Sequence, residues 1–216
     1  MVAVYFKTFL LYASVGIPPS SDINAQLDYF GSHATGWWAI ACLMIGTDLL
    51  LLPLFLGLYR ALKGLGRDLL MMMAVGCIGL FVVFDIVITW AAHSVMIASG
   101  TQYVDAASDA ARSTLVASAA FPSAILESPL AGFGAILVPS LGIFLAGIAM
   151  LRGVFGKTAV YLAMAAGVTA FAFMLTYVFE TLPSLRVVNA LIVTIWYLIV
   201  GIRLYGLSRG PRTASQ

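Results

Sequence analysis

The sequence predicts an all-α membrane protein, a polytopic bundle of transmembrane helices. Two properties of its 216 residues support this class: 62% are hydrophobic and only 9% are charged, with a mean hydropathy of +1.04. A soluble domain has about 25% charged residues, so this chain has too few charges to cover a water-facing surface. In addition, apolar stretches of about 20 residues, long enough to cross a ~30 Å hydrocarbon core, recur along the chain.

Five segments have the length and apolar composition of a membrane span. They lie at residues 36–59, 69–98, 130–151, 158–179 and 185–207. We expect the whole chain to form one membrane domain, because no linker or internal repeat divides it.

The segments between and after the spans are expected to lie outside the membrane core. Residues 18–35 are predicted to form a loop that Pro18-Pro19 opens. The alanine-rich residues 101–121 predict a helix on the outer surface, capped near Thr101 and ended by Pro122. The tail at 209–216 is expected to be disordered.

The N-terminal residues 2–17 are apolar but short, and Lys7 interrupts them. A sixth transmembrane helix, an interfacial amphipathic helix and a signal peptide are all open. A signal peptide carries its basic residue ahead of the apolar stretch, whereas here apolar residues already precede Lys7. We therefore predict a sixth span, which gives six helices plus the outer helix.

The basic residues predict the orientation of the chain in the cytoplasmic membrane. They concentrate on one side, at Arg60, Lys63, Arg67, Arg152, Lys157, Arg203, Arg209 and Arg212. The opposite side has only Arg112 and Arg186 and collects most of the acidic residues. By the positive-inside rule, the basic turns and the C-terminus lie in the cytoplasm.

Two aspartates lie inside predicted spans. Asp48 falls near the middle of the first long span, and Asp85 falls in the outer half of the next. An aspartate at such depth costs at least ~2.5 kcal/mol on insertion scales, so it faces the bundle interior or water. Both a functional site and a hydrogen-bonded packing contact fit this placement.

Further polar residues are expected near the outer ends of the spans. Asp85, Thr89 and His93 are spaced four apart, which places them on one helix face. Polar residues also gather where the last two spans meet, and Glu180 and Arg186 can be neighbours there. The predicted ligand-binding residues are Asp48, Asp85, Thr89, His93, Tyr177, Glu180, Arg186 and Asn189. A solvent-exposed polar cap with a weak ion pair is the alternative.

Several kinds of chemistry lack their sequence signals. The two histidines occur without HxxxH, HExxH or CxxCH spacing, so we predict no metal site and can name no cofactor. No GxSxG occurs and no serine has an evident base, so no catalytic residue is assigned. Cys42 and Cys77 both lie in spans and no cysteine lies in a loop, so we expect no disulfide. A net charge of +2 without a basic patch argues against nucleic-acid binding.

Two stretches, LPLFLGLYRALKG and IWYLIVGIRLYGLSR, carry a resemblance. Their layout resembles an uncharacterised prokaryotic family of six-helix integral membrane proteins, a domain of unknown function. The resemblance covers the order of the spans and the basic turns. It implies a fold and a location, and no residue role.

The leading functional hypothesis is a small membrane protein whose outward-facing polar cluster binds a small or amphiphilic molecule. One alternative is a structural or accessory subunit, which partners other membrane subunits or forms a homo-oligomer. Another is an intramembrane enzyme acting on lipid, with Asp85 and His93 as acid and base. Membrane lipid is an expected partner in each case.

Overall fold

The computed structural model describes residues 2–16, 18–19, 22–64, 66–151, 153, 155–179 and 185–209. All regular secondary structure in these ranges is helical, which confirms the all-α class. The elements are α1 (Val2–Val15), α2 (Ile23–Ser32), α3 (Ala34–Leu62), α4 (Asp68–Phe84), η1 (Asp85–Trp90), α5 (Ala91–Val104), α6 (Asp109–Glu127), α7 (Pro129–Gly132), η2 (Phe133–Leu137), α8 (Val138–Met150), α9 (Gly156–Phe179) and α10 (Leu185–Arg209). The two η elements are π-helical turns.

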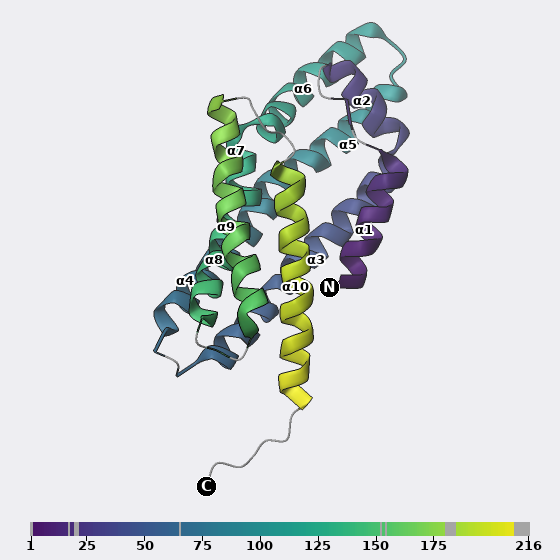
Figure 1. The fold of residues 1–216 in the computed structure, drawn as a ribbon. Helices are drawn as coiled ribbons and strands as arrows, with labels where there is room; N and C mark the ends of the chain where they lie inside the picture. The colour runs from purple at the N-terminus through teal and green to yellow at the C-terminus, as the bar shows by residue number, and fades with distance from the viewer. Residues whose placement is uncertain are drawn as a thin grey trace. The chain divides into compact units, whose positions relative to one another are not determined.

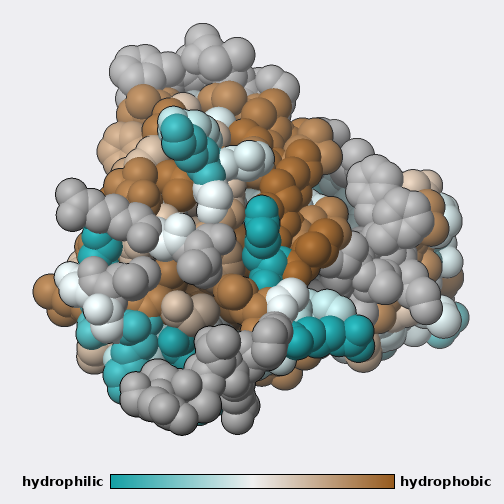
Figure 2. All heavy atoms as spheres, turned by 60° about the horizontal axis from the view of Figure 1, so that its bottom comes forward, coloured by the Kyte–Doolittle hydropathy of each residue, from teal (hydrophilic) through white to brown (hydrophobic). Residues whose placement is uncertain are grey.

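Five helical segments are long and apolar enough to cross a membrane, which indicates a multi-pass membrane protein. They are Ala34–Leu62, Asp68–Val104, Pro129–Met150, Gly156–Tyr177 and Leu185–Arg209. Large apolar side chains such as Leu80, Val168 and Ile202 are exposed on them, as expected for surfaces in contact with lipid. Figure 2 shows broad apolar areas on one face of the molecule, interrupted by a few hydrophilic groups.

The N-terminal segment forms helix α1, which has 14 residues. At 1.5 Å per residue such a helix is about 21 Å long, less than the ~30 Å hydrocarbon core. It is not among the five segments of membrane-spanning length, so the sixth span stays a prediction. The ring of Tyr12, near the end of α1, packs edge-on against Trp37 of α3, with the ring centroids 5.5 Å apart.

The loop predicted at residues 18–35 is wrong, because most of it forms helix α2. Asp22 caps this helix: its carboxylate accepts a hydrogen bond from the backbone N–H of Asn24 at 3.0 Å. Leu27 and Phe30 are buried. A helix of ten residues presents too few turns for its apolar spacing to stand out in the sequence.

The outer helix is shifted from its predicted bounds of 101–121. The helix of the second span continues to Val104, and α6 begins at Asp109 after the cap Ser108, whose hydroxyl accepts from Ala111 N–H at 3.3 Å. Pro122 does not end α6: the helix continues to Glu127, with the side chain of Pro122 buried. The predicted disordered tail lies outside the described residues beyond Arg209.

The chain divides into two compact units, Met1–Leu50 with Val82–Ala135, and Leu51–Phe81 with Ile136–Gln216. In unit 1, α2, α5 and α6 pack against one another, as Figure 1 shows. In unit 2, α8, α9 and α10 lie side by side.

Two glycines set the crossing of α2 and α5 in unit 1. A Cβ on Gly100 would lie 2.6 Å from the carbonyl oxygen of Leu27 and 2.7 Å from the backbone nitrogen of Gly31. A Cβ on Gly31 would lie 2.4 Å from the carbonyl oxygen of Gly100. The two backbones touch here, so neither position has room for a side chain.

We expect Gly100→Ala to lower the free energy of unfolding by about 1–3 kcal/mol, because the added methyl group forces two backbones apart. Chemical unfolding of the detergent-solubilised protein measures the change. Gly46→Ala is the matched control, since a Cβ there meets nothing within 4 Å. The control is expected to gain up to about 1 kcal/mol from helix propensity. Equal effects of the two substitutions would contradict the close contact.

Candidate functional site

Asp48 and Asp85 come together in the interior of unit 1. Helix α3 positions Asp48 and the π turn η1 positions Asp85, and both side chains are buried, with exposed fractions of 4% and 5%. The Asp48 carboxyl lies close enough to Asp85 for hydrogen bonding and direct charge interaction, and it also interacts with Trp90. The sequence predicted both acids as site residues but did not pair them.

Trp90 is the hydrogen-bond donor of this site. Its indole Nε1–H donates to Asp85 Oδ2 at 2.8 Å, and the bond is buried. Asp48 Oδ2 is also enclosed but has no hydrogen-bond partner. One carboxyl of the pair is therefore tied to a donor, whereas the other has an oxygen without one.

The π turn explains why Trp90, rather than Thr89, is the partner of Asp85. The N–H of Ala91, directly after the turn, donates to the carbonyl of Ile86, five residues back. In this geometry the side chain five positions along lies over the first residue, whereas in an α-helix it is the fourth. The predicted face of Asp85, Thr89 and His93 is wrong in this respect, because it assumes an unbroken α-helix.

Thr89 and His93 lie next along the same helix. The hydroxyl of Thr89 is buried without a partner, whereas its carbonyl oxygen lies 2.9 Å from Nδ1 of His93. Because a carbonyl only accepts, Nδ1 of His93 is the donor of this bond. The His93 ring stacks on Trp37, at 5.7 Å and 17°, and lies 5.0 Å from the ring of Trp90.

Trp37 and Trp90 are the residues that sequence reasoning missed at this site. Both are almost fully buried in unit 1, where Phe30 and Tyr29 also contact Trp37. Apolar composition alone assigns tryptophans near span ends to the membrane interface. The spacing of five residues between Asp85 and Trp90 is the local pattern that could have indicated their hydrogen bond. This spacing brings two side chains together only inside a π turn.

The other predicted site residues belong to unit 2. Tyr177 and Arg186 are exposed there, Asn189 is buried, and Glu180 lies outside the described residues. The prediction that these residues share one cavity with Asp85 and His93 stays a prediction.

Asn189 lies at the centre of a hydrogen-bond network that joins three helices of unit 2. Its side-chain nitrogen donates to the carbonyl of Ala166 at 2.8 Å and to Thr169 Oγ1 at 2.9 Å, both on α9. The hydroxyl of Ser140, on α8, lies 3.4 Å from both the oxygen and the nitrogen of the amide. Every polar atom of the Asn189 amide has a partner, which is the pattern of a packing contact.

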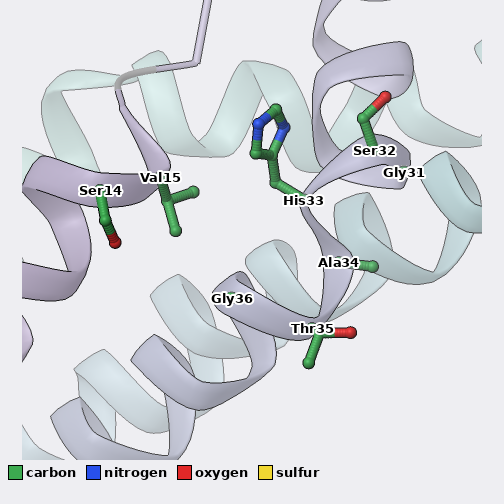
Figure 3. Close-up of a pocket in the computed structure, with 8 residues that line it drawn as sticks. All are labelled: Ser14, Val15, Gly31, Ser32, His33, Ala34, Thr35 and Gly36. Carbon is green, nitrogen blue, oxygen red and sulfur yellow. The ribbon is translucent and has the colours of Figure 1, made fainter.

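A hollow of about 240 Å³ opens elsewhere in unit 1, where α1 meets the junction of α2 and α3. Figure 3 shows His33 at this junction, between Ser14 and Val15 on one side and Ser32 on the other. The ring of His33 donates from Nδ1 to the carbonyl of Tyr29 at 3.0 Å. The hollow is open and smaller than the 300–1,000 Å³ of typical ligand pockets, and neither Asp48 nor Asp85 lines it.

Across the described ranges, no group of three or more histidine, cysteine or acidic side chains is arranged to hold a metal ion. The site around Asp48 therefore consists of two carboxyl groups, an indole donor and a layer of aromatic rings.

Comparison with models of protein families, with curated proteins and with solved structures finds no match for this chain.

We expect Asn189→Ala to lower the free energy of unfolding by about 1–2 kcal/mol, because it leaves acceptors on α8 and α9 without their donor. Thr194→Ala is the control on the same helix, since that hydroxyl bonds to Ala190 of its own helix at 2.7 Å. Unfolding in mixed detergent measures both variants. If Asn189→Ala is no more harmful than the control, the network does not stabilise unit 2.

Proposed function

We propose that this chain is a multi-pass protein of the cytoplasmic membrane that binds a small ligand at its buried polar cluster, and that this ligand is a proton. The carboxyl pair Asp48–Asp85 is the proposed binding site. The observation that carries the proposal is the enclosed Oδ2 of Asp48, which has no hydrogen-bond partner although it belongs to a carboxyl beside a second one.

Two neighbouring carboxylates that are both charged repel each other inside a protein. At a separation of 4 Å and an effective dielectric constant of 20, the repulsion is about 4 kcal/mol. A single proton removes this repulsion and turns one carboxyl into an O–H donor, which the other carboxylate accepts. One bound proton therefore satisfies the pair, with the Trp90 indole as a further donor to Asp85.

A comparison of Asp48 with Asn189 distinguishes a functional group from a packing contact. The amide of Asn189 binds fixed donors and acceptors on two neighbouring helices and needs nothing from outside. Asp48 lacks such a set, because one of its oxygens is enclosed and unpaired. Acidic groups inside membrane helices are costly and mark proton or ion pathways, so an incomplete acidic site is best explained by a proton that comes and goes.

The geometry supports a proton better than an amphiphilic molecule. A buried carboxyl pair takes up a proton without a cavity, whereas an amphiphilic molecule needs one. The hollow at His33 does not supply it, because neither Asp48 nor Asp85 lines that hollow. The orientation of the chain in the membrane follows from its charge distribution: we propose that the basic turns and the C-terminus face the cytoplasm. Lipid covers the exposed apolar faces of the spans in this proposal.

We expect a protonated carboxyl to be visible by infrared spectroscopy of the protein in lipid vesicles, as a carbonyl band that grows when the pH is lowered. The double variant Asp48→Asn with Asp85→Asn should remove this band, and each single variant should shift the pH at which it grows, because the remaining carboxyl has lost the partner that shares its proton. Asp28→Asn, a change at an exposed acid of α2, should leave the band intact. A band that survives in the double variant, or that titrates at the same pH in both single variants as in the natural sequence, would sink the proposal.

The orientation is tested by labelling single cysteines with a membrane-impermeant maleimide, in a variant without Cys42 and Cys77. Ser108→Cys should react in intact cells, and Ser208→Cys only after permeabilisation. Val2→Cys reports on α1: reaction only after permeabilisation agrees with a sixth span, and reaction in intact cells contradicts it. A Ser208→Cys variant that reacts in intact cells would reverse the proposed orientation.

A further inference from the structure

The π turn η1 contains one residue more than an α-helical turn would. Its backbone bonds reach five residues back, as the bond from Ala91 N–H to the Ile86 carbonyl shows, and α-helix flanks it on both sides. Single π turns of this kind are rare and are often found at functional positions. Here the extra residue falls on the segment that carries Asp85.

Two side chains compete for the position over Asp85. Trp90, five residues along, holds it now through the 2.8 Å bond to Oδ2. Thr89, four residues along, would take the position if the turn became α-helical, because residues four apart share a face there. The hydroxyl of Thr89 is buried without a partner in the present register, which is unfavourable, and beside Asp85 it would gain one.

Tight contacts on both sides confine such a change to the turn and the helix directly after it. Before the turn, the ring of Phe84 lies on Gly134, where a Cβ would be 1.9 Å from a ring carbon. After it, Gly100 touches the backbone of α2 at Leu27 and Gly31. If these contacts are kept, the π turn can shift along the helix only between Phe84 and Gly100. Thr89 and Trp90 can then rotate about the helix axis while the end of α5 stays in place.

The charge of the carboxyl pair affects which side chain, Trp90 or Thr89, is favoured beside Asp85. A hydrogen bond from an indole to a carboxylate is stronger when the carboxylate keeps its full negative charge. When the pair holds its proton, Asp85 also accepts the O–H of the shared proton, and the bond that holds Trp90 is weaker. Asp48 faces Asp85 from α3, and His93 on α5 contacts the Trp90 ring. From α1 and α2, the phenols of Tyr12 and Tyr29 reach the same aromatic layer through Trp37.

We propose that η1 is a register switch: Trp90 and Thr89 exchange as the neighbour of Asp85 when the carboxyl pair gains or loses its proton. The inference rests on the proton-binding function proposed above and adds its regulation. Because Trp90 contacts His93, and His93 stacks on Trp37, the exchange passes the state of the buried pair to the aromatic layer. Protonation can shift the register in this way because the two registers differ in how strongly they bind the carboxyl pair with and without its shared proton.

The switch is tested by fluorine NMR of protein labelled with fluorotryptophan, with Trp90→Phe used to assign the Trp90 signal. In the natural sequence this signal is expected to move between two positions as the pH crosses the titration of the infrared carboxyl band. Deletion of Val87, whose side chain is exposed, removes the extra residue and leaves Trp90 four positions after Asp85. The deletion variant should keep the carboxyl band, and its Trp90 signal should stay in one position at all pH values.

Thr89→Val supplies a second test that does not shorten the chain. It keeps the shape of the side chain but removes the hydroxyl that stabilises the alternative register, so the Trp90 signal should remain largely in its first position. Thr101→Val is the matched control on α5, since that hydroxyl bonds to Ile97 of its own helix at 3.0 Å. The control should behave as the natural sequence does.

The outcomes separate the two proposals. A Trp90 signal that does not move while the carboxyl band titrates overturns the switch and leaves proton binding intact. A signal that moves fully in Thr89→Val, or in the Val87 deletion, also overturns the switch. If no carboxyl band depends on Asp48 and Asp85, proton binding fails and the switch fails with it. If the deletion variant does not fold, Thr89→Val alone decides.

Discussion

The hydrogen bond from the Trp90 indole to Asp85 is the interaction on which the interior of unit 1 depends. It exists because the helix makes a π turn at this point, and Asp85 lies buried beside Asp48 rather than in lipid. A membrane interior offers no water to a carboxyl group, so each such group must find partners within the protein. Here Asp85 has a hydrogen-bond donor, whereas Asp48 keeps an oxygen without a partner, and this unpaired oxygen is the basis of the proposed proton site.

The two units differ in how their buried polar side chains are paired. In unit 2, Asn189 bonds to α8 and α9, and the network holds three helices together with every amide atom paired. Enclosed polar atoms without a hydrogen-bond partner lie at Asp48, Thr89 and the indole of Trp37 in unit 1, and at the indole of Trp196 in unit 2. A fully paired network makes a structure rigid, whereas enclosed unpaired groups favour a second arrangement in which they are satisfied. Among the described residues, unit 1 holds three of these enclosed atoms and unit 2 holds one, so unit 1 has more polar groups that a second arrangement could satisfy.

The sequence anticipated part of the site and missed its organisation. Asp48 and Asp85 stand out because charged residues are rare in apolar spans, and Asn189 and His93 were included for their place near span ends. Their pairing was not foreseeable, because contacts between helices far apart in the chain leave no trace in local spacing. Trp90 was missed since tryptophan is common near membrane interfaces, and the π turn that brings it to Asp85 has no sequence signal comparable to a cap or a proline.

The sequence by itself determined the fold class and the approximate position of five long apolar helices, because burial in lipid requires runs of apolar residues of fixed length. Tertiary structure decided what short-range patterns leave open: the helix α2 where a loop was expected, the continuation of α6 past the buried Pro122, and the register of the helix at Asp85. These depend on packing, such as the contact of Gly31 with Gly100 and of Phe84 with Gly134, which joins residues far apart in the chain. Length and hydropathy fix whether a segment is a helix, whereas close contacts between helices fix which of its side chains face each other.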